Sequence, residues 1–399
     1  MPIEARCPRV SLLQLALSML YVGIAGYGGG PAIIAIFKEL YVNRKGWLHD
    51  DVFLTGISLS QLIPGANALS MVVYLGYNLC GPLGALIAPI CFIFPSLVLM
   101  TVLSALYFSF GSLPITKALF TGLGAIVVGL ILNALLVMGK TAIKDFWSVG
   151  IAIAVFILMI FFNVPIVIVI VISAFAGLLI FYRPKNIAQS DTLPAPTNIT
   201  VRETLLFWGR WLLFFLVVAI LAYFVADTAA FRLFLALFHV GALTFGGGYS
   251  SVPLFQHEAV AVHHWLTSRE FLDGLALGQI TPGPVLITGT FIGYRVMGIL
   301  GAVIGTIAVF SPGGLAMYFV AHQHEQVKHL LWLQTMVRGI VAGFIGVLLS
   351  VTVHLIRQSI FDWKTALLAV ASAVILIVAK KDPLWVILGG AIVSILLFS

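Results

Sequence analysis

Apolar stretches long enough to cross a membrane recur along most of the chain, and short polar segments separate them. In the first part they lie at about 12–41, 52–79, 82–110, 114–138, 147–163 and 165–182. A helix rises about 1.5 Å per residue, so roughly 20 apolar residues cross the hydrocarbon core of a bilayer, which is about 30 Å thick. The same pattern returns in the second part. It predicts an all-α integral membrane protein.

The composition supports this prediction. Of the 399 residues, 61% are hydrophobic and 9% are charged, which is outside the range of soluble globular domains. The formal net charge is +7, but Lys and Arg are scattered through the connecting segments and form no continuous basic stripe. We therefore expect a lipid bilayer as a partner and no nucleic acid. Cys7, Cys80 and Cys91 lack C-x-x-C spacing, so neither a disulfide framework nor a metal site is predicted, and no cofactor is expected.

The chain contains an internal repeat. Val22–Gly65 aligns with Val240–Gly283 without a gap, and the register continues beyond these segments after one residue is dropped. The shared features include a glycine triplet and a Q-x-x-P-G motif. The repeat divides the chain into a first half at 1–182, a polar loop at 183–203, an unpaired linking transmembrane helix at 204–226 and a second half at 227–399.

The unpaired helix decides the expected symmetry. Each half has an even number of crossings whether its two broken elements both span the membrane or both form re-entrant hairpins. One extra crossing then inverts the second half, which predicts an inverted repeat, the architecture of many secondary transporters. A single re-entrant element per half would instead make the halves parallel. The hairpin arrangement places more Lys and Arg on the cytoplasmic side than the all-spanning one and is therefore favoured.

Four breaks interrupt apolar segments near the middle of the bilayer. They are Gly28-Gly29-Gly30-Pro31, Gln61-x-x-Pro64-Gly65, Gly246-Gly247-Gly248 and Gln279-x-x-Pro282-Gly283-Pro284. Inside the hydrocarbon an unpaired backbone group costs several kcal/mol, so irregular backbone occurs only where it is buried in protein or lines a watery cavity. A half-helix that begins at Pro31 would aim free N–H groups and its positive dipole end at mid-membrane. The breaks therefore predict an anion site, with close packing of helices as the alternative use of glycine.

These motifs resemble those of the chromate ion transporter family in its long, two-domain form. The resemblance rests on "YGGGPAIIAIFKELYVNRKGWL" and "SQLIPG" in the first half, and on "FGGGYSSVPLFQHEAV" and "FLDGLALGQITPGP" in the second. It implies proton-motive-force-dependent export of chromate, a tetrahedral dianion that resembles sulfate, across the inner (cytoplasmic) membrane of bacteria. The chain departs from the family pattern at Ile34, where His is common, and at Ala66-Asn67, where Pro-Thr is common.

Residues and resemblance together predict a secondary carrier with a central site for an inorganic oxyanion. Backbone N–H, amide and hydroxyl groups would contact the substrate. The residues expected there are Gly28, Gly29, Gly30, Pro31, Gln61, Pro64, Gly65, Asn67, Gly246, Gly247, Gly248, Gln279, Thr281, Pro282 and Gly283. An anion channel, or a carrier for a different small anion, is the alternative. An enzyme is not expected, because the chain has no H-E-x-x-H, G-x-S-x-G or P-loop motif.

Charged residues near the apolar segments each have two interpretations. Lys38 and Arg295 would attract the anion, and Glu39 or Glu258 would carry a coupling proton; anchoring at the membrane interface is the alternative. Asp273 lies a few residues inside an apolar helix, as an acid of its first turn or as a proton carrier. Protons are thus expected partners, and a second copy of the chain in a homodimer is a further candidate.

Overall fold

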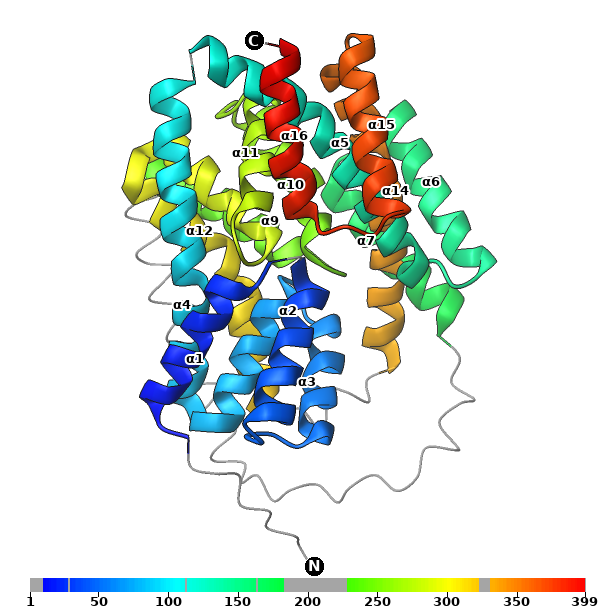
Figure 1. Cartoon of the computed structure of the whole chain (residues 1–399). Helices are drawn as coiled ribbons and strands as arrows, with labels where there is room; N and C mark the ends of the chain where they lie inside the picture. The colour runs from blue at the N-terminus through cyan, green and yellow to red at the C-terminus, as the bar shows by residue number, and fades with distance from the viewer. Residues whose placement is uncertain are drawn as a thin grey trace, which may run out of the picture.

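The computed structural model describes residues 10–27, 29–111, 113–162, 164–182, 228–322 and 331–398. Over these residues the chain is a bundle of helices in which the two halves interlock (Figure 1). This confirms the prediction of an all-α protein. Gly28, the polar loop at 183–203 and the linking helix at 204–226 lie outside the described residues, so these assignments stay predictions.

Both halves have the same order of elements. The first half contributes α1 (Leu12–Ala25), α2 (Gly29–Phe37), a π-helical segment (Lys38–Arg44), α3 (Asp50–Leu62), α4 (Asn67–Phe110), α5 (Pro114–Ala142), α6 (Phe146–Phe162) and α7 (Ile166–Phe181). The second contributes α9 (Ala229–Leu243), α10 (Ser251–Gln256), a π-helical segment (His257–Val262), α11 (Ser268–Ile280), α12 (Thr288–His322), α14 (Leu331–Ser359), α15 (Trp363–Ile377) and α16 (Pro383–Phe398). The tandem repeat therefore holds in three dimensions, down to a π-helical segment at the same place.

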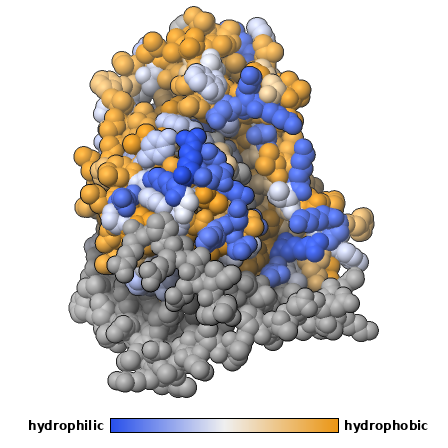
Figure 2. Space-filling model, turned by 60° about the horizontal axis from the view of Figure 1, so that its bottom comes forward, coloured by the Kyte–Doolittle hydropathy of each residue, from blue (hydrophilic) through white to orange (hydrophobic). Residues whose placement is uncertain are grey.

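Among the described residues, four segments are long and apolar enough to cross a membrane. They are Asn67–Phe110, Pro114–Ala142, Val285–Ala321 and Trp332–Ser359. Along α4, the side chains of Leu83, Leu86, Ile90 and Phe94 are all more than half exposed and form one stripe at helical spacing. Such a stripe is stable against lipid tails and unstable in water. On the face shown in Figure 2, hydrophilic residues gather in the middle of the described surface and apolar residues lie around them.

The first broken element is a hairpin that turns back at its break. Helix α1 runs antiparallel to α2 and its π-helical extension, because Ser18 Oγ donates to Tyr41 Oη at 3.0 Å and Lys45 Nζ donates to Ser18 Oγ at 3.2 Å. The hairpin turns between Ala25 and Gly29, where the glycine triplet begins. In a single helix that spans the membrane, Ser18 would lie far from Tyr41 and Lys45.

The second broken element is also a hairpin. Helix α3 packs antiparallel to the first part of α4, so closely that a Cβ on Gly56 would lie 2.6 Å from the ring of Tyr74. In the second half, α11 and the start of α12 pack the same way, and Gly274 lies against the ring of Phe291. The hairpins of the first half occupy the lower part of Figure 1 and those of the second half the upper part.

The last two helices of each half pack on the other half. Helices α6 and α7 lie against α14, and α15 and α16 lie against α5. Small residues permit this close approach: Gly339 of α14 meets Gly177 of α7, and Ser394 of α16 donates to the carbonyl of Ala118 on α5 at 2.6 Å. The halves are therefore repeats in sequence that share one core.

Candidate functional site

The breaks of one half are hydrogen-bonded to those of the other. The N–H of Gly65 donates to the carbonyl of Thr244 at 2.7 Å, and the N–H of Gly283 donates to the carbonyl of Gly26 at 2.8 Å. Gly65 and Gly283 occupy the same repeat position, and so do Gly26 and Thr244. Each Q-x-x-P-G tip thus satisfies a carbonyl at the end of the first helix of the opposite half. The breaks form one cluster at the interface between the halves.

A second reciprocal contact fixes the same tips. Gly65 has φ +108° and Gly283 has φ +100°, a region that L side chains rarely adopt. A Cβ on Gly65 would lie 2.8 Å from Cα of Gly313, and one on Gly283 would lie 2.7 Å from Oγ of Ser96. Ser96 Oγ also donates to the carbonyl of Pro282 at 2.5 Å. Glycine is required at both tips because long helices α4 and α12 pass directly beside them.

Gln279 is the predicted donor that the structure places best. Its Oε1 accepts a hydrogen bond from Tyr249 Oη at 3.0 Å, so the orientation of the amide is fixed. Its Nε2 is buried and has no hydrogen-bond partner among the described residues. A buried donor left unpaired costs about 1–3 kcal/mol, so buried amides are nearly always paired with protein, water or a ligand. The free N–H groups of Gln279 are therefore available to an acceptor.

A small pocket lies in front of Gln279. Residues from one break of each half line it, together with the loop between α15 and α16: Gly29, Tyr249, Gly278, Gln279, Thr281, Gly283, Val285, Asp382, Pro383 and Leu384. Two helices begin at this pocket, α2 at Gly29 and α16 at Pro383, but Asp382 accepts the first N–H groups of α16, so α2 alone presents an open start. Helix N-termini carry unpaired N–H groups and a partial positive charge, which favour anions. Thr281 reaches the pocket, but its hydroxyl donates to the carbonyl of Gly278.

The predicted residues of the first half are placed differently. The side chain of Gln61 is exposed, whereas its repeat counterpart Gln279 is half-buried and held by Tyr249. The repeat counterpart of Tyr249 is Pro31, so no hydroxyl is available to hold Gln61. Asn67 begins α4, and its Oδ1 is buried without a partner in the described part of the chain. The two halves thus do not build two equal sites.

The four predicted charged residues do not reach the pocket. Each contacts a charged or titratable partner elsewhere. The pairs are Lys38 with Asp50 at 3.1 Å, Glu39 with Arg44 at 2.9 Å, Glu258 with His263 at 3.5 Å, and Arg295 with Glu270 at 3.7 Å. The first two are exposed pairs of the kind that contribute about 0–1 kcal/mol. Lys38 and Glu39 lie at the end of α2 that is opposite the break.

Sequence reasoning missed the loop between α15 and α16. Lys380, Lys381 and Asp382 are exposed there, and Asp382 lines the pocket, where its Oδ1 accepts a hydrogen bond from the N–H of Leu384 at 2.9 Å. A signal was present: three charged residues stand between two short apolar helices, while the first half has the uncharged Asn163-Val164-Pro165 at the same repeat position. The carboxylate of Asp382 disfavours anion binding at the pocket, and the two lysines favour it.

The chain is similar to known membrane transport proteins over almost its whole length. A family model described as "Chromate transporter" matches residues 13–178 and 231–395. An uncharacterized transporter of Methanocaldococcus jannaschii is 33% identical over 93% of this chain and 90% of its own length. Chromate transport proteins of Cupriavidus metallidurans and Pseudomonas aeruginosa are each 30% identical, over 98% and 88% of this chain and 94% and 83% of their own lengths. No solved structure matches.

Proposed function

The chain belongs to the chromate transporter family, and we propose that it is a secondary active transporter that exports an inorganic oxyanion at the expense of the proton motive force. Its family and its apolar helices make it an ion transporter and a multi-pass membrane protein. Chromate and dianions that resemble sulfate are the proposed substrates, and the inner (cytoplasmic) membrane is the proposed location.

The unpaired amide of Gln279 in the pocket at the breaks carries this proposal. A tetrahedral oxyanion presents several acceptor oxygens and no donor, so it requires converging N–H and O–H groups. Gln279 Nε2 supplies one such donor, and the start of α2 at Gly29 supplies backbone N–H groups. Both lie in one pocket. The negative charge of Asp382 weakens the attraction of the pocket for a dianion. The positive charges of Lys380 and Lys381 in the same loop offset it.

The reciprocal contacts support an inverted repeat with alternating access. Two hairpins enter from one end of the bundle and two from the other, and their tips meet through the pairs Gly65–Thr244 and Gly283–Gly26. A tilt of the hairpins of one half against those of the other would open the pocket to one side while it closes the other. The substrate then crosses without a continuous pore, which distinguishes a carrier from an anion channel.

Transport in inverted membrane vesicles tests this proposal. Uptake of labelled chromate and of labelled sulfate is measured with and without a pH gradient, in the wild type and in Gln279→Ala, with Glu39→Gln as a matched control on the surface. We expect accumulation that requires the gradient, that Gln279→Ala loses and that Glu39→Gln keeps. Flux that continues after the gradient is collapsed would point to a channel. The absence of flux by correctly inserted protein would refute an oxyanion substrate.

A further inference from the structure

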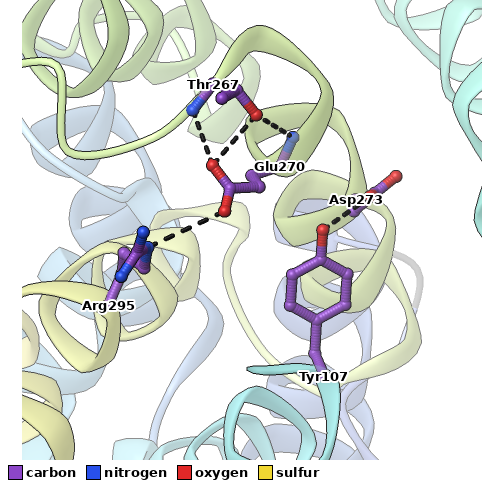
Figure 3. Close-up of polar contacts among 5 residues, drawn as sticks. All are labelled: Tyr107, Thr267, Glu270, Asp273 and Arg295. Atoms are coloured by element: carbon purple, nitrogen blue, oxygen red, sulfur yellow. Dashed lines mark hydrogen bonds and ion pairs between the residues drawn. The ribbon is translucent and has the colours of Figure 1, made fainter. Parts of the chain in front are cut away.

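A carboxylate is buried between the two halves, on the same helix as Gln279. Asp273 lies in the middle of α11 and is 3% exposed. Its Oδ2 accepts a hydrogen bond from Tyr107 Oη on α4 at 2.7 Å (Figure 3). Its Oδ1 is buried and has no partner among the described residues. An acid in the first turn of a helix, the simpler sequence interpretation, would be solvated at the helix end.

The surroundings of Asp273 are aromatic. The ring of Tyr107 packs edge-on against those of Phe120 and Phe291, with centroids 4.9 and 5.4 Å apart. Helix α16 also packs on α11 and has no titratable side chain. Arg338 of α14 is paired with Asp145. These contacts exclude water from the carboxyl.

The nearest charged groups belong to other contacts. Arg269, one turn earlier on α11, donates to Thr121 Oγ1 on α5 at 2.6 Å, close to the carbonyl of Lys117. Glu270 accepts from the N–H of Thr267 at 2.7 Å and from its hydroxyl at 2.9 Å. The other oxygen of Glu270 faces Arg295 of α12 at 3.7 Å (Figure 3). Within the described residues, no ion pair includes Asp273.

A buried carboxylate without a cation is stable mainly as the neutral acid. Burial of an isolated charge in a medium of low dielectric constant is so unfavourable that the group binds a proton instead. Acidic residues placed in this way inside membrane proteins often mark proton routes. Asp273 precedes Gln279 by six residues, or about 9 Å at helical rise. A movement of α11 that exposes the carboxyl would therefore also displace the proposed anion donor.

We propose that Asp273 is the proton-binding site that couples anion movement to the proton gradient. This inference rests on the proposed function of the pocket at Gln279. With the proton bound, the neutral acid accepts the hydrogen bond of Tyr107, and α11 stays packed on α4. Release of the proton leaves a carboxylate and one free H⁺, and the carboxylate draws water or a cation into the packed interface, which loosens α11. Its repeat counterpart is Thr55, so the repeat does not duplicate this carboxyl in the first half.

The test compares Asp273→Asn with Glu39→Gln, a surface substitution that likewise replaces a carboxyl group by its amide. Asp273→Asn should lose accumulation driven by a pH gradient but keep exchange of labelled for unlabelled anion at equal pH, since the amide mimics the protonated acid. Glu39→Gln should keep both. Tyr107→Phe removes a donor that favours the ionised carboxylate, so the pH profile of accumulation should move to higher pH. Accumulation that persists in Asp273→Asn, or exchange that is lost with it in folded protein, would overturn the proposal.

Infrared spectroscopy of the purified protein separates this inference from the proposed function. Titration should reveal the carbonyl band of a protonated carboxylic acid that disappears at high pH and is missing from Asp273→Asn. A wild type without that band, or a variant that retains it, overturns the proton site even if transport is coupled to protons. A wild type that shows the band but accumulates no anion refutes the proposed transport, while the proton site stands.

Discussion

Replacement of Gly65 by Ala tests whether the break tips are fixed by contact with the opposite half. Gly65 lies at the tip of the second hairpin with φ +108°, and its N–H donates to Thr244. An added Cβ would lie 2.8 Å from Cα of Gly313 and 3.4 Å from its N. Because backbone atoms of a packed transmembrane helix cannot rotate away, the tip or α12 must shift.

The matched control is Gly81→Ala. Gly81 also has a positive φ, +65°, at the turn within α4, but an added Cβ there meets nothing within 4 Å. The backbone conformation alone, with φ +65° and ψ −155°, should cost this control about 1–3 kcal/mol. Gly65→Ala adds the overlap with Gly313, for which overpacking costs of about 1–3 kcal/mol are typical, so a total of roughly 2–6 kcal/mol is expected. The Gly65–Thr244 hydrogen bond should weaken as well.

Thermal unfolding of the purified proteins in detergent and chromate uptake in vesicles measure these effects. Gly65→Ala should unfold at a clearly lower temperature than Gly81→Ala. Its chromate uptake should fall by more than the loss of folded protein explains. Equal unfolding temperatures and equal uptake in the two variants would refute the proposed contact between break tips.

Three further predictions concern single side chains. Gln279→Ala should abolish saturable anion uptake while the equivalent Gln61→Ala reduces it weakly, because only Gln279 is buried and oriented; equal losses in uptake assays would contradict this. Asp382→Asn should lower the apparent KM for a dianion by about tenfold, since it removes a like charge from the pocket; an unchanged KM would place the anion elsewhere. The N–H and hydroxyl of Ser148 donate to Asp145 and hold the pKa of its carboxyl below the ordinary value. The ionised carboxylate therefore stabilises the fold above the ordinary pKa of an aspartate, and this stabilisation is lost as the pH falls through the lowered pKa. In Asp145→Asn the free energy of unfolding should consequently change less with pH in the acid range than in the wild type.

The sequence was sufficient to predict the breaks, because they are built from local chemistry. Glycine triplets and Q-x-x-P-G interrupt a helix wherever they occur, and their recurrence in both halves revealed the repeat. Burial of the second and fourth breaks at one interface followed from the rule that irregular backbone avoids lipid. The reciprocal bonds of Gly65 and Gly283 agree with that expectation.

The specific partners could not be predicted, because they come from distant parts of the chain. The sequence leaves Asp273 either as an acid of the first helical turn or as a proton carrier, and its contact with Tyr107 lies 166 residues away in the chain. Lys38 and Glu39 stand at the far end of the half-helix that begins at the first break, and nine residues of helix, about 13 Å, separate Lys38 from Gly29. The difference between Gln61 and Gln279 depends on Tyr249, whose counterpart in the first half is Pro31 and has no hydroxyl.

Equilibrium binding of labelled chromate to the purified protein tests most directly whether the breaks form an anion site. The wild type should bind one anion per chain, sulfate should compete for it, and Gln279→Ala should bind much more weakly although it is folded. The absence of saturable binding by the wild type, or equal affinities for the wild type and Gln279→Ala, would contradict an anion site at the breaks.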